Sequence, residues 1–457
     1  VLYLVLLNVI GWAASRRQTE TSSDYFLAGR GVSVWPLIIS TVATTYTCGT
    51  MLTSPGQFFS VGSNFLWVAT VSFTSLLMLL FGLKIYRLAK ARNYITPGDL
   101  MSDFYPSRRV HAVVALVGLL CLLPDMVAQL VALGTTFAAL TKGAAPDAAS
   151  AIPFWAGVLI SGGAGLLYMY TGGMRAVIWN TVLQGVFFVG MLVVTAFLTT
   201  SEAGGWDKVV TNLTTEFEPL LTIPEGGVLP FYEGYLLFVA LFCIPFFWQR
   251  MYMAKSAKEL AINALSLPLA SLIMFISCYV IGVGSLALFA PGEVQPDALM
   301  GTLFRVYWKS AGPILLMAAF SAGLSTICGE LMTASSIVVR DLGKGADLSD
   351  QQQVGRGRIA VIVVMALMTG IALLLEGFPV ILLILLGIQL AIVMLPALLG
   401  IFLWRRATED AAFASIAIGT AFYLLDWTGQ FAIPILAPEL LNDLPPGAFD
   451  PIPALGL

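Results

Sequence analysis

Long apolar segments recur along this chain of 457 residues, and they limit its fold more than any other feature. The predominantly apolar windows are 1–15, 34–60, 63–90, 111–141, 151–172, 175–200, 229–253, 260–290, 312–339, 357–375, 379–404 and 410–432. Most are long enough for a helix to cross a bilayer, which takes about 20 residues. Only 11% of the residues are charged, against about 25% in soluble globular proteins. The sequence therefore predicts an all-α polytopic membrane protein whose surroundings are the lipid bilayer.

Reactive and charged side chains give no support to other protein classes. The five cysteines all lie in apolar windows without metal-ligand spacing, and the single histidine is His111. No basic run with interleaved aromatic residues points to nucleic acid. We therefore expect neither an enzyme nor a nucleic-acid-binding protein, and no obligate protein partner is evident.

The basic residues predict the orientation in the membrane. When alternate loops are assigned to one side, 19 of the 23 lysines and arginines fall together, and only Lys142, Lys208, Arg305 and Lys309 fall on the other side. Cytoplasmic loops carry the excess of Lys and Arg. This bias predicts a multi-pass protein of the cell (inner) membrane with its N-terminus outside the cytoplasm.

The windows also predict an internal repeat within one transmembrane domain covering residues 1–457. Residues 34–200 and 228–404 contain five windows each. An odd number of crossings makes the second half enter from the opposite side, which gives an inverted repeat. Residues 1–15 are interpreted as a truncated first helix, and 410–457 as a truncated C-terminal helix or helices.

Hydroxyl side chains interrupt the first window of the first half. Serine and threonine fill eight of the fifteen positions from Ser40 to Ser54. They favour a place where the helix opens, because irregular backbone inside a membrane must lie against protein or a cavity. Pro55-Gly56 is expected to close this helix. A second hydroxyl pair, Ser325-Thr326, lies in window 312–339, and we interpret the two places as halves of one buried ion site. Alternatively, these hydroxyls bond back to carbonyls four residues earlier.

The second half opens with a matching candidate break at Pro245. Proline removes one backbone donor and crowds the preceding turn. An ordinary kink is the alternative interpretation. Corresponding breaks in both halves of a repeat predict a binding site near the membrane midplane.

Motifs along essentially the whole chain resemble the sodium:solute symporter family. They are Asp24-Tyr-Phe-Leu-Ala-Gly-Arg30, Gly172-Gly-Met-Arg-Ala-Val-Ile-Trp179, the Ser325-Thr326, Ser335-Ser336 and Arg340-Asp341 pairs, and Trp404-Arg-Arg-Ala-Thr408. The resemblance implies a leucine-transporter-like fold, a 5+5 inverted repeat with an extra N-terminal helix and at least one C-terminal helix. It also implies a sodium-coupled secondary active symporter that imports a small organic solute by alternating access.

The resemblance implies a Na+ ligand set between the first and eighth core helices. The ligands would be the carbonyls of Ala43, Tyr46 and Ala322 and the hydroxyls of Ser325 and Thr326. The last three share one helix face, since residues three and four apart lie one above another. Several family members carry a carboxylate where this chain has Thr45 or Thr181, so we expect a single sodium ion.

Two acids occupy positions inside apolar windows, where a charged side chain costs about 2.5–3.5 kcal/mol on insertion scales. Asp125 is expected near the midplane, to meet a cationic substrate group or carry a proton. Glu330, one turn beyond Thr326, is expected to guide the ion out or relay a proton. Either could instead be a hydrogen-bonded structural residue.

The resemblance places the solute beside the broken helices. The implied contacts are Thr45, Thr47, Thr50, Asp125, Gln129, Phe247, Trp248 and Gln249. Phe247 and Trp248 would form an aromatic gate. Arg175 and Arg250 are expected at the cytoplasmic helix ends, away from the solute.

Two alternatives to sodium symport remain at this stage. Some histidine kinases carry such a module as a sensory membrane domain, and Asp125 or Glu330 could make the chain proton-coupled.

Overall fold

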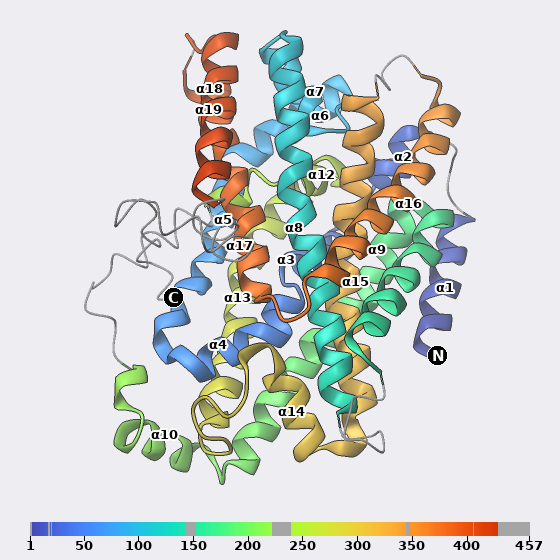
Figure 1. The fold of residues 1–457 in the computed structure, drawn as a ribbon. Helices are drawn as coiled ribbons and strands as arrows, with labels where there is room; N and C mark the ends of the chain where they lie inside the picture. Colours follow the sequence, from blue (N-terminus) through green and yellow to red (C-terminus); the bar gives the residue numbers. More distant parts are fainter. Residues whose placement is uncertain are drawn as a thin grey trace, which may run out of the picture.

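In a computed structural model, the described residues, 2–16, 19, 21–142, 152–221, 239–343, 348–404 and 406–427, form a bundle of helices (Figure 1). The described part of every predicted apolar window contains helix. The long elements are α1 (Leu2–Ser15), α3 (Val34–Thr45), α6 (Leu83–Arg92), α8 (Arg108–Thr141), α9 (Phe154–Glu202), α13 (Ala257–Ser285), α15 (Gly312–Ile337), α16 (Asp350–Leu374), α17 (Val380–Ala391) and α19 (Glu409–Trp427). Residue 1 of the first window, residue 151, and residues 229–238 of the seventh window lie outside the described residues, as do residues 428–457 of the expected C-terminal segment.

Several shorter helices connect or extend the long ones. They are α2 (Ser22–Leu27), α4 (Ser54–Val61), α5 (Thr74–Leu77), α7 (Pro97–Phe104), α10 (Trp206–Thr215), α12 (Pro245–Met253), α14 (Leu299–Val306) and α18 (Leu395–Leu403). Figure 1 shows α7 and α18 at one end of the bundle and α10 and α14 at the other. The α1 and α19 helices lie at opposite edges.

The first predicted break is present. Helix α3 ends at Thr45, and Tyr46 takes an extended backbone conformation (φ −99°, ψ 103°). A π-helical segment, Gly49–Thr53, then leads into α4. The prediction that Pro55-Gly56 closes this helix is wrong. Pro55 lies in the first turn of α4, where its missing N–H costs nothing, and the helix ends at Gly62 (φ 56°).

The second predicted break lies directly before Pro245. Ile244 is extended (ψ 131°), and Pro245 occupies the first turn of α12. The indole Nε1 of Trp248 donates to the Phe242 carbonyl at 2.8 Å and so satisfies one backbone acceptor of the irregular turn. Pro245 therefore starts a helix after a break and does not kink a continuous one.

A third change of direction divides α9. Gly173 has φ 52° and ψ −154°, values that leave the helical region. This kink separates the two predicted windows 151–172 and 175–200. The second part of α9, Gly172–Glu202, is by itself long and apolar enough to span a membrane.

Helix α15 is the central element of the bundle. In this helix, 83% of the apolar window is buried inside the molecule. The corresponding share is 39–56% in the other six membrane-length helices of the described chain. Gly323 lets it approach the first break, because a Cβ there would lie 2.8 Å from the Cys48 Sγ. Outward-facing helices expose large apolar side chains, for example Phe197 (73%) and Leu374 (84%). Such surfaces suit contact with lipid tails.

Candidate functional site

The end of α3 meets the middle of α15 at the two hydroxyls that the sequence singled out. The Ser325 Oγ lies 2.6 Å from the Ala43 carbonyl oxygen and 2.8 Å from that of Ala322. The Thr326 Oγ1 lies 3.4 Å from the Thr44 carbonyl and 3.3 Å from that of Ala322. Both hydroxyls are fully buried. Back-bonding within α15 and contact across to α3 therefore coexist.

The break in α3 explains why these carbonyls face another helix. The last carbonyls of a helix lack the donors that a continuing helix would supply. Because α3 stops at Thr45, the Ala43 and Thr44 carbonyls belong to this group and accept from α15 instead. Five neutral oxygens, from Ala43, Thr44, Ala322, Ser325 and Thr326, thus lie at this crossing. Oxygen ligands suit hard cations. A Tyr46 carbonyl ligand stays a prediction, although Tyr46 forms the break itself.

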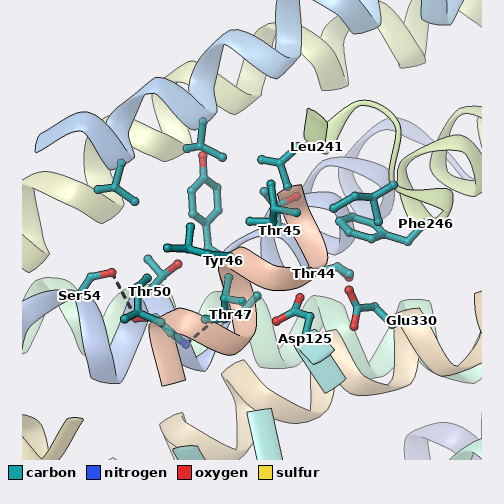
Figure 2. Close-up of a pocket in the computed structure, with 18 of the residues that line it drawn as sticks. Thr44, Thr45, Tyr46, Thr47, Thr50, Ser54, Asp125, Leu241, Phe246 and Glu330 are labelled. Atoms are coloured by element: carbon teal, nitrogen blue, oxygen red, sulfur yellow. Dashed lines mark hydrogen bonds between the residues drawn. The ribbon is translucent and has the colours of Figure 1, made fainter. Parts of the chain in front are cut away.

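Beside this crossing lies a small cavity of about 70 Å³ (Figure 2). A single bound water needs about 10–15 Å³ of such cavity volume. The cavity therefore has room for several waters or for a small solute. One wall is polar and comes mainly from the broken first helix. The other walls are apolar and come from 67–71, 241–246, α13 and α17. The lining residues are Thr44, Thr45, Tyr46, Thr47, Gly49, Thr50, Ser54, Trp67, Val68, Val71, Cys121, Asp125, Leu241, Ile244, Phe246, Phe275, Glu330, Ile381, Ile384, Leu385 and Ile388.

Four of the implied solute contacts line this cavity: Thr45, Thr47, Thr50 and Asp125. The Thr45 hydroxyl donates to the Thr41 carbonyl at 2.8 Å, and the Thr47 hydroxyl accepts the Gly49 N–H at 3.1 Å. Each hydroxyl keeps hydrogen-bonding capacity beyond the one bond described. The threonines thus shape the break and can also present polar atoms to a solute.

Gln129 connects the break to the acids without lining the cavity. Its Oε1 accepts the Cys48 N–H at 2.8 Å, and its Nε2 donates to the Asp125 Oδ1 at 2.6 Å. Asp125 in turn faces Glu330 of α15 (Figure 2). Glu330 is 1% exposed, and its Oε2 has no hydrogen-bond partner among the described residues. A polar chain therefore runs from the unwound segment to the helix that carries Ser325. The expected ion-exit or proton-relay role of Glu330 stays a prediction.

The structure places the three implied contacts of α12 outside the cavity. Phe247, Trp248 and Gln249 are buried but are not among its lining residues, whereas Phe246 is. Both ends of the Gln249 amide are taken by α15, with Ser336 accepting and Thr333 donating at 2.8 Å each. Because Pro245 begins the helix, Phe246 is the aromatic residue that turns toward the cavity.

Arg250 lies in the last turn of α12, at a helix end as expected, but not at the surface of the molecule. Its side chain is 1% exposed, and its Nη2 donates to the Thr44 Oγ1 at 2.7 Å. The guanidinium also lies against Gly329, where a Cβ would be 3.1 Å away. The buried guanidinium of Arg250 therefore lies beside Thr44, the residue that follows Ala43. Arg175 instead pairs with Asp24 at 2.6 Å and keeps a third of its side chain exposed.

These features define a class of protein. A multi-pass helical bundle with two broken helices, helix-end carbonyls that face a neighbouring helix and a small internal cavity is the architecture of secondary transporters. The family model for the sodium:solute symporter family matches residues 25–419, and the chain belongs to this family.

Named relatives and a solved structure agree with this assignment. The chain is 25% identical to the sodium/pantothenate symporter of Escherichia coli (strain K12), covering 93% of this chain and 88% of the relative. It is also 25% identical to the osmoregulated proline transporter OpuE of Bacillus subtilis (strain 168), covering 93% and 87%. The fold resembles a Na+-coupled sialic acid symporter with a TM-score of 0.70 at 17% identity, over 93% of this chain and 96% of that one.

Family membership answers several of the sequence-based questions. The chain is a multi-pass, leucine-transporter-like, sodium-coupled symporter of a small organic solute. The family consists of transporters, so the prediction that the chain is not an enzyme is confirmed. The match favours symport over the sensory-domain and proton-coupled alternatives. The division into five plus five helices stays a prediction.

Proposed function

We propose that the coupling sodium ion binds where the end of α3 faces α15. Its ligands are the carbonyls of Ala43, Tyr46 and Ala322 and the hydroxyls of Ser325 and Thr326. The observation that supports this most is the contact of the Ser325 Oγ with the Ala43 carbonyl at 2.6 Å, and the Thr326 Oγ1 lies 3.4 Å from the carbonyl of the next residue, Thr44. Sodium takes the position between these oxygens, and the Ser325 and Thr326 hydroxyls keep their protons but turn them away, so that each offers a lone pair to the ion. The ion thus ties the two helices together.

The solute binds in the adjacent cavity, against the unwound segment at Tyr46 and Thr47. Sodium orders this segment because it holds the last carbonyls of α3, so the ion prepares the surface that the solute contacts. Preordering by a first ligand lowers the ordering cost for the second, which is positive coupling. Relatives named for pantothenate and proline indicate solutes of this size class.

The protein works by alternating access in the cell (inner) membrane, with its N-terminus outside the cytoplasm. The distribution of 19 of 23 basic residues on one side supports this orientation. Sodium then enters from the outside and is released inside, down its electrochemical gradient. The solute follows in the same direction.

A double substitution tests the sodium site. Purified Ser325→Ala/Thr326→Ala protein, reconstituted in proteoliposomes, should lose sodium-stimulated uptake of labelled proline or pantothenate, whichever the unmodified protein transports. It should also lose thermal stabilisation by sodium. The matched control is Ser415→Ala/Thr420→Ala, which removes two back-bonded hydroxyls of α19. Full sodium stimulation in the Ser325/Thr326 variant would exclude this site.

A further inference from the structure

Two acidic side chains meet at the wall of the cavity, from helices far apart in the sequence. Asp125 comes from α8 and Glu330 from α15, and Figure 2 shows their carboxyl groups directed toward each other. Asp125 is partly exposed and lines the cavity. Glu330 is almost fully buried; its carboxyl group is hydrogen-bonded to that of Asp125, while its Oε2 has no partner among the described residues. Such a buried acceptor lacks the hydrogen bond that buried polar groups normally have.

Among the described residues that line the cavity, none supplies a positive charge to balance this pair. No lysine, arginine or histidine belongs to the described residues that line it. The buried Arg250 is not among the lining residues either, and its Nη2 is engaged with Thr44. Two facing carboxyl groups repel when both are ionised, and burial weakens the screening by water. A positive charge supplied by a ligand relieves this repulsion and satisfies the free oxygen.

The rest of the cavity shows what kind of ligand carries that charge. Its remaining surface is mostly apolar, with Trp67, Phe246 and Phe275 among the larger side chains. A bare metal ion gains nothing from such a surface. An organic solute with a positively charged group and a hydrocarbon part matches both the acidic pair and the apolar walls of the cavity. The faces of aromatic rings also attract cations.

The geometry points to a transported solute that carries an ammonium group, bound by Asp125 and Glu330 with its hydrocarbon part on the apolar wall. This inference rests on the proposed function, because it takes the cavity as the solute site. It narrows the solute to small amines or zwitterions and excludes simple carboxylates. The absence of a basic residue from the described lining leaves a carboxylate without a charged partner.

A series of matched probes tests this on the full chain in proteoliposomes, by recording sodium-dependent currents on a solid-supported membrane. The probes are proline, butylamine, butyramide and butyrate. Responses are expected to proline, butylamine or both, and neither to butyramide nor to butyrate. Asp125→Asn should weaken the apparent affinity for the responding amine at least about tenfold, the loss of a charged hydrogen bond. Glu330→Gln should weaken it in the same direction, and the exposed Asp410→Asn should not change it.

Sodium-dependent thermal stabilisation separates this inference from the proposed function. Asp125→Asn should keep that stabilisation, which also shows that the variant is folded. Sodium-driven responses to butyrate or butyramide as strong as those to butylamine would overturn the inference and leave the sodium site standing. So would an Asp125→Asn effect on sodium cooperativity, or on pH dependence, with an unchanged ranking of probes. Those results would assign the acids to a second sodium ion or to a proton.

Discussion

At the residue scale, Arg250 is the side chain whose environment differs most from expectation. A buried guanidinium is stable only with acceptors, and the Thr44 hydroxyl is the acceptor found among the described residues. Its Nε and Nη1 have no partner there. The same threonine also offers its carbonyl to Thr326. Arg250 therefore fixes the end of α3 that we assign to sodium.

The Arg250–Thr44 contact predicts strong coupling between two substitutions. Thr44→Val removes the acceptor and leaves a buried charge, which should cost about 1.5–3 kcal/mol. Arg250→Met removes the charge and the need for an acceptor. Adding Thr44→Val to Arg250→Met should therefore cost much less than Thr44→Val alone. Thermal unfolding of the four proteins in one detergent gives the double-mutant cycle, and additive effects would contradict the contact.

Gln129 predicts a second residue-scale effect. Gln129→Met keeps the length of the side chain but leaves the buried Cys48 N–H without its acceptor and Asp125 without its donor. An unsatisfied buried donor costs about 1–3 kcal/mol, so both the melting temperature and solute affinity should fall. The exposed Gln351→Met serves as the control. An unchanged solute affinity in Gln129→Met would show that the bridge does not shape the cavity.

At the scale of elements, the close approach of α17 to α8 sets one wall of the cavity. A Cβ at Gly387 would lie 2.4 Å from the Cys121 carbonyl oxygen, which is backbone and cannot rotate away. Helix α17 also carries Ile381, Ile384 and Ile388 of the cavity lining. Its distance from α8 therefore determines the width of the solute site.

Gly387→Ala should push these helices apart. Overpacking of this kind typically costs about 1–3 kcal/mol, and the displaced wall should also weaken solute binding. Gly370→Ala in α16 is the matched control, because a Cβ there meets nothing within 4 Å. Thermal unfolding and uptake are measured on both variants. Equal behaviour of the two would mean that α17 is free to shift without consequence.

The elements also show what sequence reasoning can reach. Apolar windows and hydroxyl-rich or proline-containing breaks are local signals, and they predicted the helices and both interruptions. The meeting of Ser325 with Ala43 needed the family resemblance, because it joins helices far apart in the chain. The burial of Arg250 was missed because a basic residue near the end of an apolar window is normally exposed at the membrane interface. Phe246 and Phe247 are adjacent, and only the start of α12 at Pro245 decides which one faces the cavity.

At the scale of the whole molecule, one helix connects the ion to the solute. Helix α15 carries Ser325 and Thr326 at the proposed sodium site and Glu330 at the cavity, one turn apart. It is also the most buried membrane-length helix of the described chain. A cation bound at either place therefore acts on an element that packs against much of the bundle. Coupling follows if the occupied and empty sites favour different packings of α15 against the broken helices.

Charge movement across the membrane gives the prediction that tests this scheme as a whole. Each elementary charge moved inward gains about 2.3 kcal/mol per 100 mV, equivalent to about a 50-fold change in accumulation. One sodium ion with a zwitterion moves one charge, whereas one sodium ion with a monovalent amine moves two. In proteoliposomes with a potassium–valinomycin potential, accumulation of the amine should therefore rise with about twice the voltage slope of the zwitterion. Accumulation that ignores voltage for both solutes would mean that no net charge enters with the solute, which contradicts sodium symport through the α3–α15 site.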